Sequence, residues 1–186
     1  IGCEVIELNS HIDENYMPST LEDQTNSFER MGQIVTALDA TAGFWLGPSG
    51  ERSVYIDSNG KVISETETLT LLSSLIATSR KEGSIALPIA APHTIDEIAR
   101  EHRIQIIRTK GDGRSLGVAA TDSDVQMAGD LEGRIAFTDF QPHFDGMYAI
   151  AKTLELLARS EQTLAGLLEQ IPRRPYRKIQ LPCGWE

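Results

Sequence analysis

Three cations at the end of a predicted strand are spaced closely enough to bind one phosphate group. Arg108 ends the β-rich run Ile104–Arg108, and Lys110 and Arg114 follow it. However, the chain carries 17 basic and 27 acidic residues, which gives a formal charge of −10. Pairing of these cations with neighbouring carboxylates is therefore the competing interpretation.

The histidines and cysteines show no spacing that would indicate catalysis or metal binding. Cys3 and Cys183 lie near opposite ends of the chain without a CxxC motif, which predicts two reduced thiols. No histidine has a partner at the spacing of a zinc site or a catalytic triad. These four residues are His11, His93, His102 and His143. We identify neither a catalytic residue nor a set of metal ligands among these residue types.

Short β-rich runs alternate with helical periodicity, a pattern typical of an α/β fold with sheets covered by helices. Strands are predicted at Glu4–Leu8, Gly43–Leu46, Ser53–Ile56, Ser84–Leu87, Ile104–Arg108 and Arg134–Phe137. Helices are predicted around Glu22–Leu38, Thr68–Ser79, Ile95–His102, Ser115–Thr121, Asp145–Ala158 and Leu164–Gln170. Ser58-Asn59-Gly60 predicts a turn, because Asn and Gly tolerate positive φ.

Two breaks in composition divide the chain. A polar stretch at Asn9–Ser27 leads into a helix, and Pro172-Arg173-Arg174-Pro175 ends the last helix, since proline cannot continue it. We expect a partial domain at residues 1–63, a full domain at 64–171 and a connector at 172–186. The chain begins without Met, so we expect it to be a piece of a longer protein.

Charge and hydropathy exclude two classes of partner. A net charge of −10 repels phosphate backbones and anionic membranes, so we expect no nucleic-acid partner. The apolar runs, such as residues 104–107, which Gln105 interrupts, fall far short of the ~20 residues that span a membrane. With no signal peptide, the sequence predicts a soluble, cytoplasmic protein without a membrane partner.

The order of several motifs resembles that of the α-D-phosphohexomutases. The motifs are Ile1–Asn9, Ala40–Asp57, Arg108-Thr109-Lys110, and Asp145-Gly146 before a leucine-rich helix. The resemblance covers nearly the whole chain. It implies mixed sheets covered by helices, with part of the family's second domain at 1–63, its third domain at 64–171, and a connector towards a missing last domain.

The resemblance also identifies a metal loop that has lost most of its ligands. Active members hold Mg²⁺ with three carboxylates in a loop of the form Asp-Gly-Asp-Gly-Asp-Arg, and the matching residues here are Gly47-Pro48-Ser49-Gly50-Glu51-Arg52. Gly47 and Ser49 replace two of the carboxylates. Because Mg²⁺ requires several hard oxygen ligands, Glu51 alone predicts no metal site, and the Glu51-Arg52 pair is interpreted as part of a hairpin turn.

A second loop has changed in the same way. The sugar-recognition loop of active members resembles Gly-Glu-x-Ser-Gly-His, and the matching residues here run from Gly129 to Arg134. Asp130, Glu132 and Arg134 replace the family's glutamate, serine and histidine. Asp130 could still accept a hydrogen bond from a hydroxyl group, but the resemblance favours an ordinary loop over a sugar-binding one.

Two further parts of a mutase site are expected outside this chain. The family's phosphoserine loop belongs to its first domain and its phosphate-gripping loop to its fourth, so the chain alone is predicted to run no mutase reaction. We expect no cofactor in this fragment, with Mg²⁺ in the parent's catalytic domain or, in the alternative below, at the 47–51 loop.

Three segments of this chain resemble one particular branch of the family. These are residues 129–137, 140–146 and Pro182-Cys183-Gly184-Trp185-Glu186. They are similar to the degenerate mutase-like region fused behind a bacterial mannose-1-phosphate guanylyltransferase, which makes GDP-mannose. Two alternatives remain open: a fragment of an active phosphomannomutase or phosphoglucomutase, and a stand-alone interaction module. Expected partners are the parent's remaining domains, with a sugar phosphate, a sugar nucleotide or a second copy as further candidates.

Overall fold

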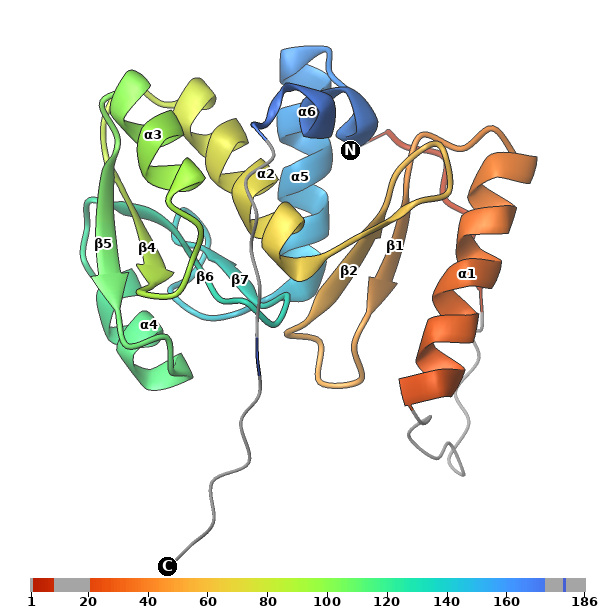
Figure 1. Ribbon diagram of the computed structural model, residues 1–186, viewed down its shortest axis with the longest axis horizontal. Coiled ribbons are helices and arrows are strands. Elements are labelled where there is room, and N and C mark those ends of the chain that lie inside the picture. The colour runs from red at the N-terminus through yellow and green to blue at the C-terminus, as the bar shows by residue number, and fades with distance from the viewer. Residues whose placement is uncertain (1, 9–20, 173–178, 180–186) are drawn as a thin grey trace, which may run out of the picture.

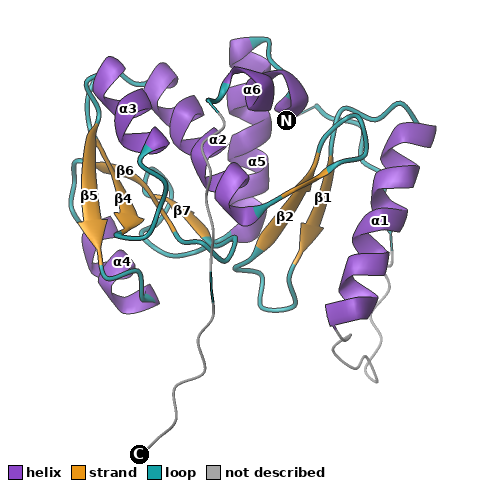
Figure 2. Ribbon diagram, in the orientation of Figure 1, coloured by secondary structure: helices purple, strands orange, loops and turns teal. Residues whose placement is uncertain are grey.

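A computed structural model describes residues 2–8, 21–172 and 179 of the chain (Figures 1 and 2). The first part is an antiparallel sheet in the order β1-β2-β3. Its strands are β1 (Gly43–Leu46), β2 (Ser53–Ile56) and β3 (Val62–Ile63). Helix α1 (Leu21–Ala37) runs alongside this sheet (Figure 1).

The second part is a four-stranded mixed sheet in the order β5-β4-β6-β7. Its strands are β4 (Ser84–Pro88), β5 (Gln105–Thr109), β6 (Val125–Gly129) and β7 (Ile135–Phe137). Strand β4 pairs in parallel with β5 and β6, and β7 pairs antiparallel with β6. The helices of this part are α2 (Glu65–Ser79), α3 (Thr94–Glu101), α4 (Gly113–Ala120), α5 (Gly146–Ser160) and α6 (Leu164–Gln170).

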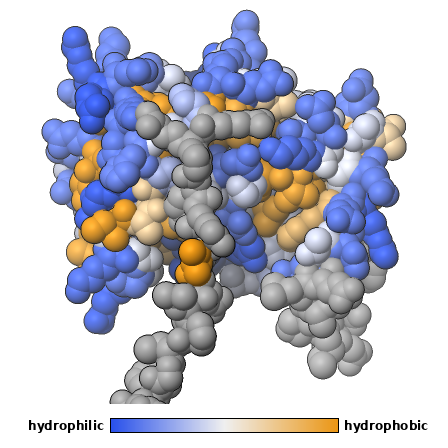
Figure 3. Space-filling model, viewed as in Figure 1, coloured by the Kyte–Doolittle hydropathy of each residue, from blue (hydrophilic) through white to orange (hydrophobic). Residues whose placement is uncertain are grey.

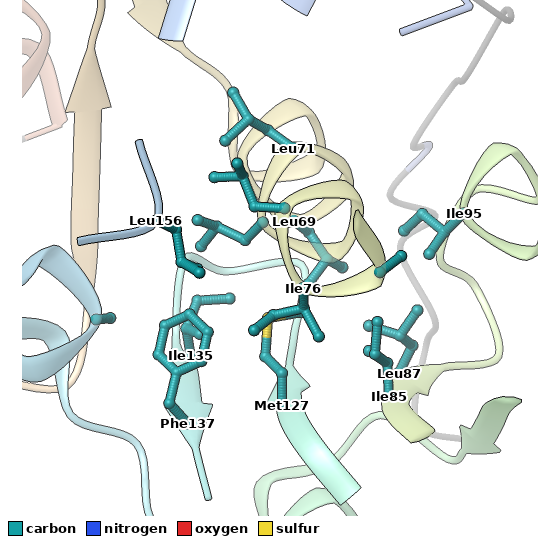
Figure 4. Close-up of a cluster of buried hydrophobic side chains, with 14 of the residues drawn as sticks. Leu69, Leu71, Ile76, Ile85, Leu87, Ile95, Met127, Ile135, Phe137 and Leu156 are labelled. Atoms are coloured by element: carbon teal, nitrogen blue, oxygen red, sulfur yellow. The ribbon is translucent and has the colours of Figure 1, made fainter. Parts of the chain in front are cut away.

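The main hydrophobic core lies between the four-stranded sheet and helix α2. Figure 4 shows Leu69 and Ile76 of α2 above Ile85, Met127 and Ile135 of the sheet, all of them at most 1% exposed. A smaller cluster on the opposite face packs α4 against the same sheet. The sheet is therefore covered on both sides, whereas the outer surface in Figure 3 is mostly hydrophilic.

Local sequence explains where several elements begin and turn. Helix α2 starts with a complete capping box, in which the Ser64 hydroxyl accepts from the Glu67 N–H and the Glu67 carboxylate accepts from the Ser64 N–H. Between β2 and β3, the Asp57 carboxylate accepts from the backbone N–H groups of Asn59 and Lys61. Gly60 has a φ of +78°, so the predicted turn is confirmed.

The predicted α/β class with mixed sheets and covering helices is confirmed. All six predicted helices are present, with ends that differ by up to three residues, and five predicted strands match β1, β2, β4, β5 and β7. The predicted strand Glu4–Leu8 is wrong, because residues 2–8 form no strand and are exposed. The buried central strand β6 was not predicted. Among the described residues, no helix is long and apolar enough to cross a membrane.

Candidate functional site

The two loops singled out in the sequence lie against each other in the structure. The 47–52 loop joins β1 to β2, and the 129–134 loop joins β6 to β7. The Ser53 N–H donates to the Gly133 carbonyl over 3.0 Å, and Arg52 and Arg134 form an isolated antiparallel bridge. This contact joins the three-stranded sheet to the four-stranded sheet at one point.

Asp130 organises the 129–134 loop from within. Its Oδ1 accepts from the backbone N–H groups of Glu132 and Arg134 at 2.8 and 3.0 Å, and its Oδ2 accepts from Arg134 Nε at 2.6 Å. The residue is 2% exposed. Both carboxylate oxygens are thus already occupied by the loop itself.

Arg134 is held by opposite charges and by an aromatic ring. Glu132 lies 3.5 Å from its Nη2, and its guanidinium carbon is 5.1 Å from the centre of the Phe144 ring. Partial burial lowers the pKa of Arg134, but the hydrogen bond and charge of Asp130, with the charges of Glu132 and Glu51, raise it by more. A permanent cation therefore lies between the two loops.

The 47–52 loop is a tight hairpin. Its arginine, Arg52, forms an ion pair with Glu65 of α2. Gly50 has a φ of +76°. The Gly47 N–H donates to the Arg52 carbonyl, and the Gly47 carbonyl accepts from the Gly50 N–H. The Arg52 Nη2 lies 2.7 Å from Glu65, and its guanidinium carbon is 5.9 Å from the Trp45 ring centre. Glu51 is exposed.

The residues present do not fit a Mg²⁺ ion. Mg²⁺ is held in octahedral geometry and prefers carboxylate oxygens. Glu51 is the one carboxylate in the 47–52 loop, and Asp130 is already engaged by Arg134. No group of three or more His, Cys, Asp or Glu side chains within the described ranges could hold a metal. We therefore derive no step through a metal at this site.

The first residue of helix α5 contacts the 47–52 loop. The Gly146 N–H donates to the Gly50 carbonyl over 2.7 Å, and a Cβ added at Gly146 would lie 2.9 Å from that carbonyl oxygen. The Asp145 carboxylate caps the helix by accepting from the Tyr148 N–H. The hairpin therefore contacts both the 129–134 loop and the start of α5.

The three cations considered as a possible phosphate contact have different surroundings in the structure. Arg108 donates to the carbonyls of Pro88 and Ala91 at 2.8 and 2.9 Å, and it pairs with Asp96. Its guanidinium thus holds the loop that follows β4 through two backbone carbonyls. Lys110 and Arg114 are exposed, and among the described residues no partner holds their side chains.

Sequence reasoning missed the residues that complete this site. Glu65, Trp45 and Phe144 each contact one of its two arginines, yet these contacts depend on tertiary packing, which no spacing rule predicts. Residues 180–186, including the predicted Cys-x-Trp-Glu segment, and most of the predicted connector at 172–186 lie outside the described residues.

Residues 65–174 match the family model described as "Phosphoglucomutase/phosphomannomutase, alpha/beta/alpha domain III". That match covers more than half of the chain. The chain belongs to the phosphoglucomutase/phosphomannomutase family. The match includes β4 to β7 and the 129–134 loop with Asp130 and Arg134.

Curated members of the phosphoglucomutase/phosphomannomutase family resemble the chain over nearly its whole length. A phosphoglucomutase/phosphomannomutase of Thermococcus kodakarensis is 27% identical over 173 residues, which are 93% of this chain and 38% of that protein. A phosphoglucosamine mutase of Methanocaldococcus jannaschii is 22% identical, over 98% of this chain and 42% of that protein. The chain thus spans about two fifths of the length of these relatives.

Solved structures of the family share the fold. A phosphoglucomutase/phosphomannomutase family protein from Burkholderia thailandensis matches with a TM-score of 0.77 and 24% identity, over 92% of this chain and 38% of that one. An N-acetylphosphoglucosamine mutase from Aspergillus fumigatus matches with a TM-score of 0.58 and 16% identity, over 72% and 36%. At these identities the likeness shows the fold alone.

Proposed function

We propose that this chain is a non-catalytic, mutase-like region of a larger protein. The observation that supports this most is the ion pair between the Asp130 carboxylate and the Arg134 guanidinium. It lies next to the 47–52 loop, which contains one carboxylate. Phosphoryl transfer needs a positioned cation and open donors aimed at the phosphate. The 47–52 loop holds one carboxylate for a metal ion, and the guanidinium of Arg134 is already paired with Asp130, so we assign no catalytic residue in this chain.

The finer proposal concerns the parent protein. The likeness of residues 129–137, 140–146 and 182–186 to the degenerate region of mannose-1-phosphate guanylyltransferases supports a parent that makes GDP-mannose. Mannose 1-phosphate would react with GTP, with loss of pyrophosphate, in a nucleotidyltransferase domain outside this chain. Mg²⁺ would serve that domain, in the cytoplasm, and this chain would contact the parent's other domains.

A second function is favoured by the curated relatives, which are named as mutases. In this alternative the chain belongs to an active phosphomannomutase or phosphoglucomutase, and Glu51 contributes to a weaker metal site. The two functions differ in what the full-length parent does.

The deciding experiment uses the purified full-length parent in two assays. We expect it to form GDP-mannose from GTP and mannose 1-phosphate, and not to interconvert mannose 1-phosphate and mannose 6-phosphate. Mutase turnover that depends on Mg²⁺ and is lost in Glu51→Ala would contradict the proposal and favour the second function. Absence of both activities would favour an interaction module.

A separate measurement tests the metal loop in this chain. Only a ligand that binds the folded state raises the melting temperature, so millimolar Mg²⁺ should leave the melting temperature unchanged. The matched control is the triple variant Gly47→Asp, Ser49→Asp, Glu51→Asp, which offers three carboxylates and should gain a saturable shift. A Mg²⁺-dependent shift in the unmodified chain that disappears in Glu51→Ala would show a working metal site.

A further inference from the structure

Strand β5 forms an open edge of the four-stranded sheet. Within the described residues it pairs with β4 alone, and Figure 1 shows it at the margin of the molecule between α3 and α4. An unpaired edge presents a row of backbone donors and acceptors that another strand can join.

The pairing with β4 shows which backbone groups of β5 point outward. The Gln105 N–H donates to the Gly83 carbonyl over 3.0 Å, and the Thr109 carbonyl accepts from the Ile89 N–H over 2.8 Å. In a parallel ladder alternate residues make these bonds. Ile106 and Arg108 therefore direct their N–H and C=O groups away from the sheet.

This edge lacks the features that usually prevent pairing. Native edge strands are often blunted by lysine, proline or a bulge. Strand β5 reads Gln-Ile-Ile-Arg-Thr and keeps a regular register with β4. Its single charge, Arg108, is bound to Asp96 and to two carbonyls of the preceding loop. The edge can therefore accept another strand without burying an unpaired charge of its own.

The surroundings of β5 are basic in an otherwise acidic chain. Residues 100–114 hold five basic and two acidic residues, whereas the whole chain holds 17 and 27. Arg100 and Arg103 precede the strand, and Lys110 and Arg114 follow it. All four are exposed, and among the described residues no ion pair engages them.

Two of these cations, Arg100 and Arg103, line a hollow beside the first half of β5. It is an open depression lined by residues of α3, of β5 and of the segment between them. The lining residues are Asp96, Arg100, Arg103, Ile104, Gln105 and Ile106. An acidic side chain seated there would meet two guanidinium groups.

We propose that the β5 edge binds an extended, acidic peptide segment of a partner protein, which adds to the sheet as a fifth strand. Backbone pairing would supply affinity and the flanking cations specificity. Five strand residues span about 17 Å, so a segment of roughly seven residues would reach the cations at both ends. The chain's net negative charge opposes this little, since charges beyond about 8 Å are screened at physiological salt.

A second copy of this chain fits the edge less well than an acidic segment. Antiparallel pairing of β5 with itself would bring Lys110 of one copy towards Arg103 of the other, because these residues flank opposite ends of the strand. Like charges brought together in this way disfavour the pairing. Charge complementarity therefore selects an acidic partner.

The test uses the whole 186-residue chain and a fluorescein-labelled nonapeptide with two acidic residues at each end and alternating Val and Thr between them. We expect saturable binding by fluorescence anisotropy, with shifts of the Ile106 and Arg108 amide signals by NMR. Arg103→Glu should weaken binding about tenfold, whereas Arg30→Glu, an exposed charge reversal on α1, should not. A peptide N-methylated at alternate residues should not bind.

Three results would overturn the proposal. They are equal binding by Arg103→Glu and Arg30→Glu, equal binding of the N-methylated peptide, and no binding by the unmodified chain. A dimer in light scattering without peptide that disappears in Ile106→Pro would instead assign the edge to a second copy. Melting curves of each variant establish that it is folded.

Discussion

Asp130 is the residue on which the 129–134 loop depends. Asp130→Asn keeps the shape of the side chain and its acceptor for the backbone amides, but it removes the charge that faces Arg134. We expect a loss of about 2 kcal/mol in the free energy of unfolding, measured by urea denaturation.

The control for Asp130 is Glu132→Gln. Glu132 is 67% exposed and lies 3.5 Å from Arg134, so its removal should change the free energy of unfolding by less than about 1 kcal/mol. Equal losses for the two variants would show that the buried carboxylate is not the main partner of Arg134.

Burial of the Tyr55 hydroxyl should affect how stability changes at alkaline pH. Burial raises the pKa of Tyr55, which outweighs the lowering effect of its hydrogen bonds with Ser53 and Thr153. Because the folded-state pKa exceeds the unfolded one, the stabilising contribution is present below pH ~10 and is lost as pH rises above it. Tyr55→Phe should lose less stability than the unmodified chain between neutral and alkaline pH, measured by denaturation at each pH. Reversible ionisation of Tyr55 near pH 10 in the folded chain would contradict this.

At the level of elements, the junction between the β1–β2 hairpin and α5 requires glycine at position 146. A Cβ there would lie 2.9 Å from the Gly50 oxygen and 3.2 Å from the Arg52 oxygen. Gly146→Ala should therefore force the hairpin away from α5 and lower the free energy of unfolding by about 1–3 kcal/mol.

The matched variant is Gly117→Ala in α4, where a Cβ would meet nothing within 4 Å. Alanine has the higher helix propensity, so this variant should be as stable as the unmodified chain or up to about 1 kcal/mol more stable. If thermal denaturation gives the two variants the same sign, the close contact at Gly146 does not constrain the junction.

Two strands show what sequence patterns could and could not predict. Strand β6 ends in Ala128-Gly129, residues with low β propensity, and a Cβ at Gly129 would lie 2.6 Å from Leu69 of α2. Small residues are needed there by the packing of another element. Residues 4–8 include the β-branched Val5 and Ile6, which favour a strand, but no described segment pairs with them. Composition indicates the propensity of a segment and does not supply its partner.

The candidate site was predictable to the extent that it lies in short contiguous loops. The changed residues of the 47–52 and 129–134 loops could be located through the resemblance of short motifs to those of the family. The ion pair of Arg134 with Asp130, and the binding of Arg108 to the loop after β4, depend on rotamers and on tertiary contacts. The resemblance therefore located the loops but could not say which charges neutralise one another.

At the scale of the whole molecule, the two sheets should unfold together. The Tyr55 hydroxyl of β2 lies 3.4 Å from Thr153 of α5, and the Ser53–Gly133 hydrogen bond joins the sheets directly. Trp45 lies in the three-stranded sheet, so in a Trp185→Phe variant its fluorescence reports on that part. We expect fluorescence and far-UV circular dichroism to give one coincident urea transition. An earlier fluorescence transition would show two independent units.

The ion pair between Asp130 and Arg134 also constrains how this protein can change over evolutionary time. A substitution at either position alone leaves the other charge partly buried without its partner, and residues in such contact do not act additively. Each single step is therefore less fit for folding than a joint change. Among descendants of this sequence, positions 130 and 134 should vary together, and a change to an uncharged residue at 134 should follow or accompany loss of the carboxylate at 130.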